Sequence, residues 1–152
     1  MTRLTGARRT GRVLVVAGVL ALFARAPSAQ SGERFHGRLS VMPVDFATAP
    51  TMSGSGEAYA TFTNGTLVVT GQFEGLSSPA TVAHIHRAPP ARRGPVTFTL
   101  DVTSAVSGTL GGTFALDASQ TRTLRESGYY VQIHTEHNGG GEIRGWLMPP
   151  RR

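Results

Sequence analysis

Apolar and polar residues alternate along short stretches of the chain, and turn residues separate these stretches about every ten positions. Side chains that alternate with a period of two point to opposite faces, which is the pattern of a half-buried β-strand. The pattern predicts about eight strands. They are residues Phe35 to Val41, the two arms of a hairpin from Glu57 to Phe73, Thr81 to Arg87, Val96 to Val102, Leu110 to Leu116, Tyr129 to Thr135 and Glu142 to Leu147.

The clearest element is the hairpin, whose turn is Asn64-Gly65. Both positions of a two-residue hairpin turn require positive φ, which asparagine and glycine tolerate. Counting outward from the turn gives two faces. The face expected in the core carries Phe62, Leu67, Ala60 and Val69, and the face expected in solvent carries Tyr59, Thr61, Thr63 and Thr66.

One segment, Ser119 to Ser127, is suited to a short helix. Asp117 or Ser119 can cap its start, and Gly128 suits its C-terminal end. Helical patterns are otherwise scarce, and the chain is rich in glycine, with 19 residues, and in proline, with 9. We therefore expect an all-β fold, an antiparallel β-sandwich or Greek-key barrel of about eight strands with one short helix.

The first residues are typical of an export signal. A head rich in arginine precedes an apolar run from Val13 to Ala24, and small residues follow up to Ala29. The run has the length of a signal sequence and is too short for a stable membrane span. We expect a signal peptide over residues 1–29, export to the periplasm or the extracellular space, and no membrane span after cleavage. Residues 30–152 then form one domain with its core at about residues 35–147.

The charge of the chain lies mostly in that signal. Of 15 basic residues, five precede Ala29, where there is no acidic residue, so the rest of the chain has ten basic against nine acidic residues. Without a basic stripe, this balance excludes a nucleic-acid partner. The chain has no cysteine, which excludes thiol catalysis and thiolate metal sites.

Histidine is the most informative residue type, because four of the five histidines lie in two short segments. His84 and His86 share the polar face of one expected strand. His134 lies on the polar face of a later strand, with His137 just beyond it. If these strands and the last one are neighbours, one polar patch results, made of His84, His86, His134, Glu142 and Arg144.

Two motifs resemble the CHRD domain, which is repeated in the secreted protein chordin and widespread as a single-domain bacterial protein. They are Ala83-His84-Ile85-His86 and His134-Thr135 followed by Gly141-Glu142-Ile143-Arg144-Gly145. The resemblance spans roughly Phe35 to Leu147. It implies an exported β-rich domain whose biochemical activity is generally undefined, and it supplies no catalytic residues.

The sequence leaves three interpretations open. In the first, which the sequence favours, the domain is a non-catalytic binding or structural module. The histidines with Glu142 and Arg144 then form a polar network or a surface for an unknown protein or small ligand, since histidine on a strand face is most often a satisfied polar residue.

In the second interpretation the histidines bind copper or zinc. Histidines two residues apart on one strand face can reach the same ion, and a third from a neighbouring strand completes a three-nitrogen set. His134 is the first choice for this third ligand and His137 the reserve. The sequence requires no cofactor, and copper or zinc is the only one it suggests.

The third interpretation is an enzyme similar to copper-zinc superoxide dismutase, which also uses a His-x-His strand for copper. The chain lacks the cysteine pair of that enzyme and the dense histidine and aspartate run of its zinc site. We therefore expect no redox catalysis.

Overall fold

The computed structural model describes residues 32–41 and 46–150, so the expected signal peptide lies outside the described residues. One α-helix, α1 (Ala118–Arg125), and one 3-10 turn, η1 (Ala49–Thr51), accompany the strands. No helix in the described ranges is long and apolar enough to cross a membrane. The strands are β1 (Glu33–Val41), β2 (Ser55–Thr63), β3 (Thr66–Glu74), β4 (Ala80–Arg87), β5 (Val96–Val102), β6 (Gly108–Ala115), β7 (Tyr129–Thr135) and β8 (Ile143–Trp146).

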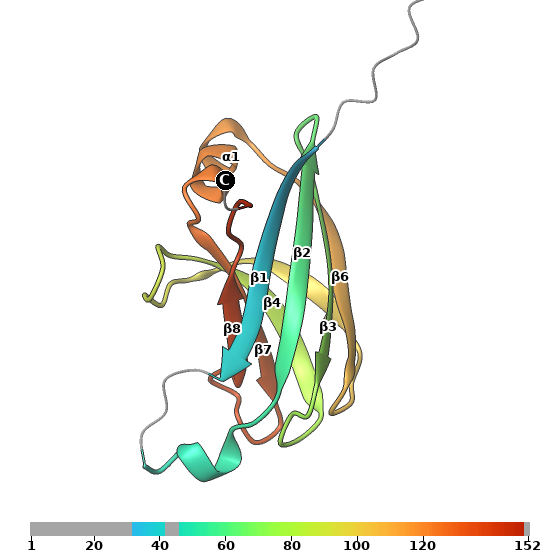
Figure 1. Ribbon diagram of the computed structural model, residues 1–152, viewed down its shortest axis with the longest axis vertical. Helices are drawn as coiled ribbons and strands as arrows, with labels where there is room; N and C mark the ends of the chain where they lie inside the picture. Colours follow the sequence, from blue (N-terminus) through green and yellow to red (C-terminus); the bar gives the residue numbers. More distant parts are fainter. Residues whose placement is uncertain (1–31, 42–45, 151–152) are drawn as a thin grey trace, which may run out of the picture.

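The strands close into an antiparallel barrel in the order β1-β2-β3-β6-β5-β4-β7-β8 (Figure 1). Strands β4, β5 and β6 form a meander that lies between β3 and β7. The connection from β3 to β4 and the connection from β6 to β7 therefore each pass over two strands, as in a Greek key. Helix α1 lies at one end of the barrel and η1 at the other (Figure 1). The all-β prediction is confirmed.

Two seams of the barrel have the fewest paired residues, with two residue pairs between the strands at each. Strands β1 and β8 pair through Ser40–Arg144 and Val41–Ile143, beside one separate bridge between His36 and Met148. Strands β5 and β6 pair only through Asp101–Gly111 and Val102–Leu110. The barrel is therefore two four-stranded halves, β1-β2-β3-β6 and β5-β4-β7-β8, which resemble the two layers of a sandwich.

The expected hairpin is confirmed in register and in burial. Phe62 pairs with Leu67 and Ala60 with Val69, and all four side chains are buried in the core. The turn residues Asn64 and Gly65 have φ angles of 51° and 81°. Of the residues expected in solvent, Tyr59, Thr61 and Thr66 are exposed and Thr63 is half-buried.

Helix α1 begins at the expected cap. The Asp117 carboxylate accepts a hydrogen bond from the Gln120 backbone N–H, and the Gln120 side chain accepts one from the Asp117 N–H, which makes a capping box. At the other end, the left-handed position is taken by Ser127, with φ of 57°, and not by Gly128. Gly128 follows it and donates its N–H to the Thr123 carbonyl at 2.8 Å.

Replacing Ser127 with glycine is therefore expected to stabilise the protein by about 1 kcal/mol, because a non-glycine residue is strained at positive φ. Urea unfolding measures the change. Ser119→Gly inside α1 is the matched control and should destabilise, since glycine is the poorer helix former at ordinary helical angles. Equal effects of the two substitutions would contradict this explanation.

Candidate metal site

Three histidines come together on the outer face of β4 and β7. Ala83 and Ile85 face the core, so the strand turns His84 and His86 outward. Strand β7 pairs directly with β4, placing His134 opposite Val82 and beside His84. The ligand nitrogens of His84, His86 and His134 all lie within 4.8 Å of one another.

Hydrogen bonds to backbone carbonyls determine which ring nitrogens are free. Nδ1 of His86 lies 2.9 Å from the Gly94 carbonyl, and Nδ1 of His134 lies 2.9 Å from the Gly139 carbonyl. Because a carbonyl only accepts, each Nδ1 carries the proton and each Nε2 keeps its lone pair. Nε2 of His134 is 3.2 Å from Nδ1 of His84, and Nε2 of His86 is buried without a hydrogen-bond partner.

The surroundings of His84 and His86 favour their neutral forms. Burial lowers the pKa of His84, and the nearby His134 and His86 add to that shift. Burial also lowers the pKa of His86, against the Gly94 carbonyl, which raises it, while His134 and Arg144 lower it further. A neutral imidazole is the form that binds a metal ion.

An aromatic stack continues from His86 across β7 to β8. The ring centres of His86 and Tyr130 lie 4.8 Å apart at an interplanar angle of 5°, and those of Tyr130 and Trp146 lie 5.0 Å apart with the rings tilted by 44°. The loop between β4 and β5 covers this stack: Gly94 donates its N–H to the Tyr130 hydroxyl at 3.2 Å, and Trp146 Nε1 donates to the Ala88 carbonyl at 3.0 Å. The loop thereby holds the His86 ring in place.

The family model of the CHRD domain matches residues 40–147, which include the three clustered histidines and the aromatic stack. The chain belongs to the CHRD domain family. No curated protein and no solved structure shows a significant match. The residues matched by the CHRD family model run from the end of β1 to the residue after β8, so they include most of the barrel.

Arg144 and Glu142, the two polar residues of this CHRD domain expected beside the histidines, lie in different surroundings in the structure. Arg144 lies opposite Gln132 and is only 8% exposed, with its guanidinium carbon 5.6 Å from the Tyr130 ring centre and 5.1 Å from that of Trp146. Glu142 is instead fully buried in a different network. Its carboxylate accepts hydrogen bonds from the backbone N–H groups of Ser53 and Ser77 and from the side chains of Thr135 and Asn138.

The expectation that Glu142 joins the histidines is therefore wrong. Gly141 has φ of 106°, and β8 begins only at Ile143, so Glu142 precedes the strand and does not follow its alternation. Two of the four hydrogen bonds, from Ser53 and Ser77, connect the β7–β8 turn to the segments before β2 and β4. The other two, from Thr135 and Asn138, lie within the end of β7 and the turn itself.

His137 is also apart from the other three histidines. It is exposed in the turn after β7, where its backbone N–H donates to the Ser78 hydroxyl at 2.9 Å. Gln132, which the sequence did not single out as a contact, lies closer: its Nε2 is 3.3 Å from His134 Nε2 and donates to the Gly140 carbonyl at 3.1 Å. The alternation of the sequence places Gln132 on the same strand face as His134, and this could have identified it as a neighbour of the histidines.

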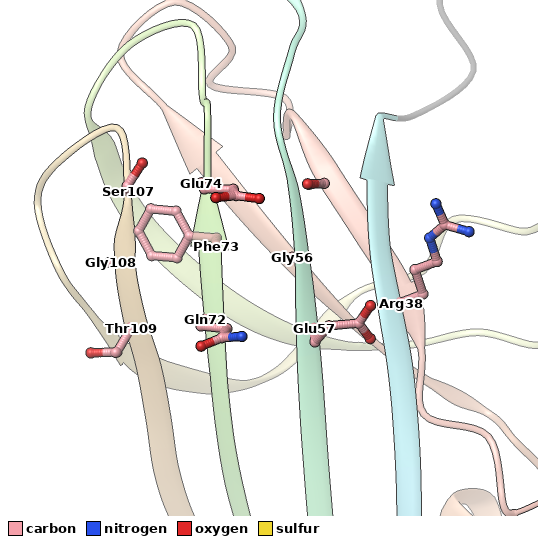
Figure 2. A pocket seen from close by; sticks show the side chains of 10 residues that line it. Arg38, Gly56, Glu57, Gln72, Phe73, Glu74, Ser107, Gly108 and Thr109 are labelled. Atoms are coloured by element: carbon pink, nitrogen blue, oxygen red, sulfur yellow. The ribbon is translucent and has the colours of Figure 1, made fainter.

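The other half of the CHRD domain carries a separate shallow groove of about 500 Å³. Polar side chains from successive strands line it, among them Arg38 on β1, Glu57 on β2, Gln72 on β3 and Thr109 on β6 (Figure 2). No histidine lines this groove. The histidine cluster and the groove are thus distinct features of the surface.

Proposed function

We propose that this protein is an exported CHRD domain that binds one copper or zinc ion through Nδ1 of His84 and Nε2 of His86 and His134. The observation that carries the proposal is the approach of three ligand nitrogens within 4.8 Å from two adjacent strands. Export is supported by the basic and apolar segments within residues 1–29.

The second nitrogens of the rings support a metal ligand set. Metal-binding histidines usually donate their other N–H to a carbonyl or carboxylate, which fixes the ring and its tautomer. His86 and His134 each do so, through Gly94 and Gly139. The aromatic stack and the β4–β5 loop further restrict the His86 ring.

Without an ion, His134 Nε2 is the acceptor, because its Nδ1 donates to the Gly139 carbonyl, and His84 Nδ1 donates a hydrogen bond to it across 3.2 Å. A metal ion would take the place of that proton, with His84 changing to its other tautomer. Three nitrogens leave a fourth coordination position open, and Cu²⁺ binds such nitrogen sites more tightly than Zn²⁺. The proposed role is binding, with no catalytic residue assigned.

The competing function is a module in which the same histidines only pack and hydrogen-bond. The His84–His134 and His86–Gly94 contacts favour it, since they satisfy polar groups without an ion. Metal titration separates the two functions directly.

We expect the purified protein to bind one Cu²⁺ in calorimetry, at least tenfold more tightly than Zn²⁺. The His84→Ala, His86→Ala double variant should lose this binding, because one histidine cannot hold the ion alone. His137→Ala is the matched control and should bind as the unaltered protein does. Trp146, the single tryptophan, supplies a second readout, because Cu²⁺ bound near the stack should quench its fluorescence.

Two results would contradict the metal site. One is the absence of stoichiometric Cu²⁺ or Zn²⁺ binding by the folded, unaltered protein. The other is binding that survives in the double variant, which would place the ion elsewhere. Either result leaves the structural module as the function of the histidines.

A further inference from the structure

The histidine cluster is bordered by a buried positive charge that has no counter-charge. Arg144 is 8% exposed, and its Nη1 atom is buried without a hydrogen-bond partner. Among residues 32–41 and 46–150, the carboxylates within ion-pair distance of a basic side chain are Glu57, beside His36, and Glu33, beside Arg125. No carboxylate of the described chain therefore neutralises Arg144.

A second arginine, Arg93, adds positive charge near Arg144. Burial lowers the pKa of Arg144, and the charge of Arg93 lowers it further, although Tyr130 opposes the shift. Arg93 precedes Gly94, the residue that holds both His86 and Tyr130. The charge of Arg144 in turn reaches His86, whose pKa it lowers. The arginines and the cluster thus belong to one electrostatic environment.

A buried guanidinium normally has an anionic partner, because removing a charge from water is costly. The faces of Tyr130 and Trp146 offset only part of this cost. A divalent ion held by the histidines would place two more positive charges beside Arg144. The combined site would then attract negative charge strongly, and the open coordination position is where an anion can bind.

We propose that the metal-loaded site takes a small inorganic anion as its fourth ligand, held by the positive charge of Arg144 with a weaker contribution from Arg93. The inference rests on the proposed function. Binding is a ligand exchange in which the anion donates a lone pair to the metal and a water molecule leaves. Arg144 acts as a positioning residue and does not itself contact the metal.

Azide is a suitable probe, because its complex with Cu²⁺ has a charge-transfer absorption that neither partner has alone. The protein is loaded with one equivalent of Cu²⁺ and titrated with sodium azide at constant ionic strength. We expect a saturable band in the unaltered protein. Arg144→Gln should weaken azide binding about tenfold at equal copper occupancy, and Arg144→Lys, which keeps the charge, should restore most of the affinity.

Two exposed arginines complete the test. Arg93→Glu reverses a charge on the surface loop and should weaken azide binding about fivefold. Arg34→Gln, on the far half of the barrel, is the control and should change it less than twofold. If Arg144→Gln does not fold, the Arg93→Glu result decides.

The outcomes separate the two proposals. If the unaltered protein binds no copper, the proposed function fails and the anion site fails with it. If copper binds but azide gives no band, or if Arg144→Gln and Arg93→Glu bind azide as tightly as Arg34→Gln, only the anion site is overturned.

Discussion

Replacing Glu142 with glutamine is expected to lower the free energy of unfolding by about 1.5 to 3 kcal/mol. The Glu142 carboxylate is fully buried and accepts four hydrogen bonds, two of them from the backbone amides of Ser53 and Ser77. A glutamine amide removes the charge and turns an N–H₂ group toward donors that then lack an acceptor. Urea unfolding measures the loss. Glu136→Gln, an exposed acid at the same end of the barrel, should change stability by less than about 0.5 kcal/mol.

The same carboxylate should make stability depend on pH. Burial raises the pKa of Glu142, but the hydrogen bonds from Thr135, Ser53 and Ser77 outweigh it, so the net shift is downward. A group with a lowered pKa in the folded state stabilises the protein above its unfolded pKa, which is about 4.3 for glutamate, and this stabilisation is lost as the pH falls through the folded value. The difference between the unaltered protein and Glu142→Gln should therefore shrink below about pH 4.3. A difference that stays constant down to pH 2 would show that the carboxylate is not the titrating group.

Phe62→Ala is expected to cost about 3 to 5 kcal/mol, because a large core side chain is removed and the barrel end cannot collapse around the space. Phe62 is 7% exposed, and its ring lies 5.9 Å from the guanidinium carbon of Arg125. Thr61→Ala, the exposed neighbour on the opposite face of β2, is the matched control and should cost less than about 1 kcal/mol. Thermal and urea unfolding compare the two. Similar losses in both variants would remove Phe62 from the core.

The local elements of this fold were predictable because their signals are local. Strands β5 and β7 have the bounds that alternation predicted, Val96–Val102 and Tyr129–Thr135. Strand β6 begins earlier than expected, at Gly108, because its glycines give no apolar alternation although they pair with β3. The order of the strands could not be predicted, since the β3–β6, β4–β7 and β1–β8 pairings join distant segments.

The candidate site was also predictable only in part, for the same reason. The period of a strand is enough to put His84 and His86 on one face, but only the β4–β7 pairing brings His134 to them. The contacts from Gly94 to His86 and Tyr130 depend on the path of a loop, which alternation does not describe. Glu142 was assigned to the wrong network because the positive φ of Gly141 interrupts the alternation just before it.

The two short seams, β1–β8 and β5–β6, are the places where the barrel is expected to open locally. Strands β5 and β6 share two residue pairs, and β1 and β8 share two, with the His36–Met148 bridge beside them. We therefore expect local opening to begin at these two seams. All three clustered histidines lie on β4 and β7, inside one half and joined by seven residue pairs. We therefore expect a seam to open locally while the β4–β7 pairs keep the three ring nitrogens at their spacing, so that the ligand set does not require a closed barrel.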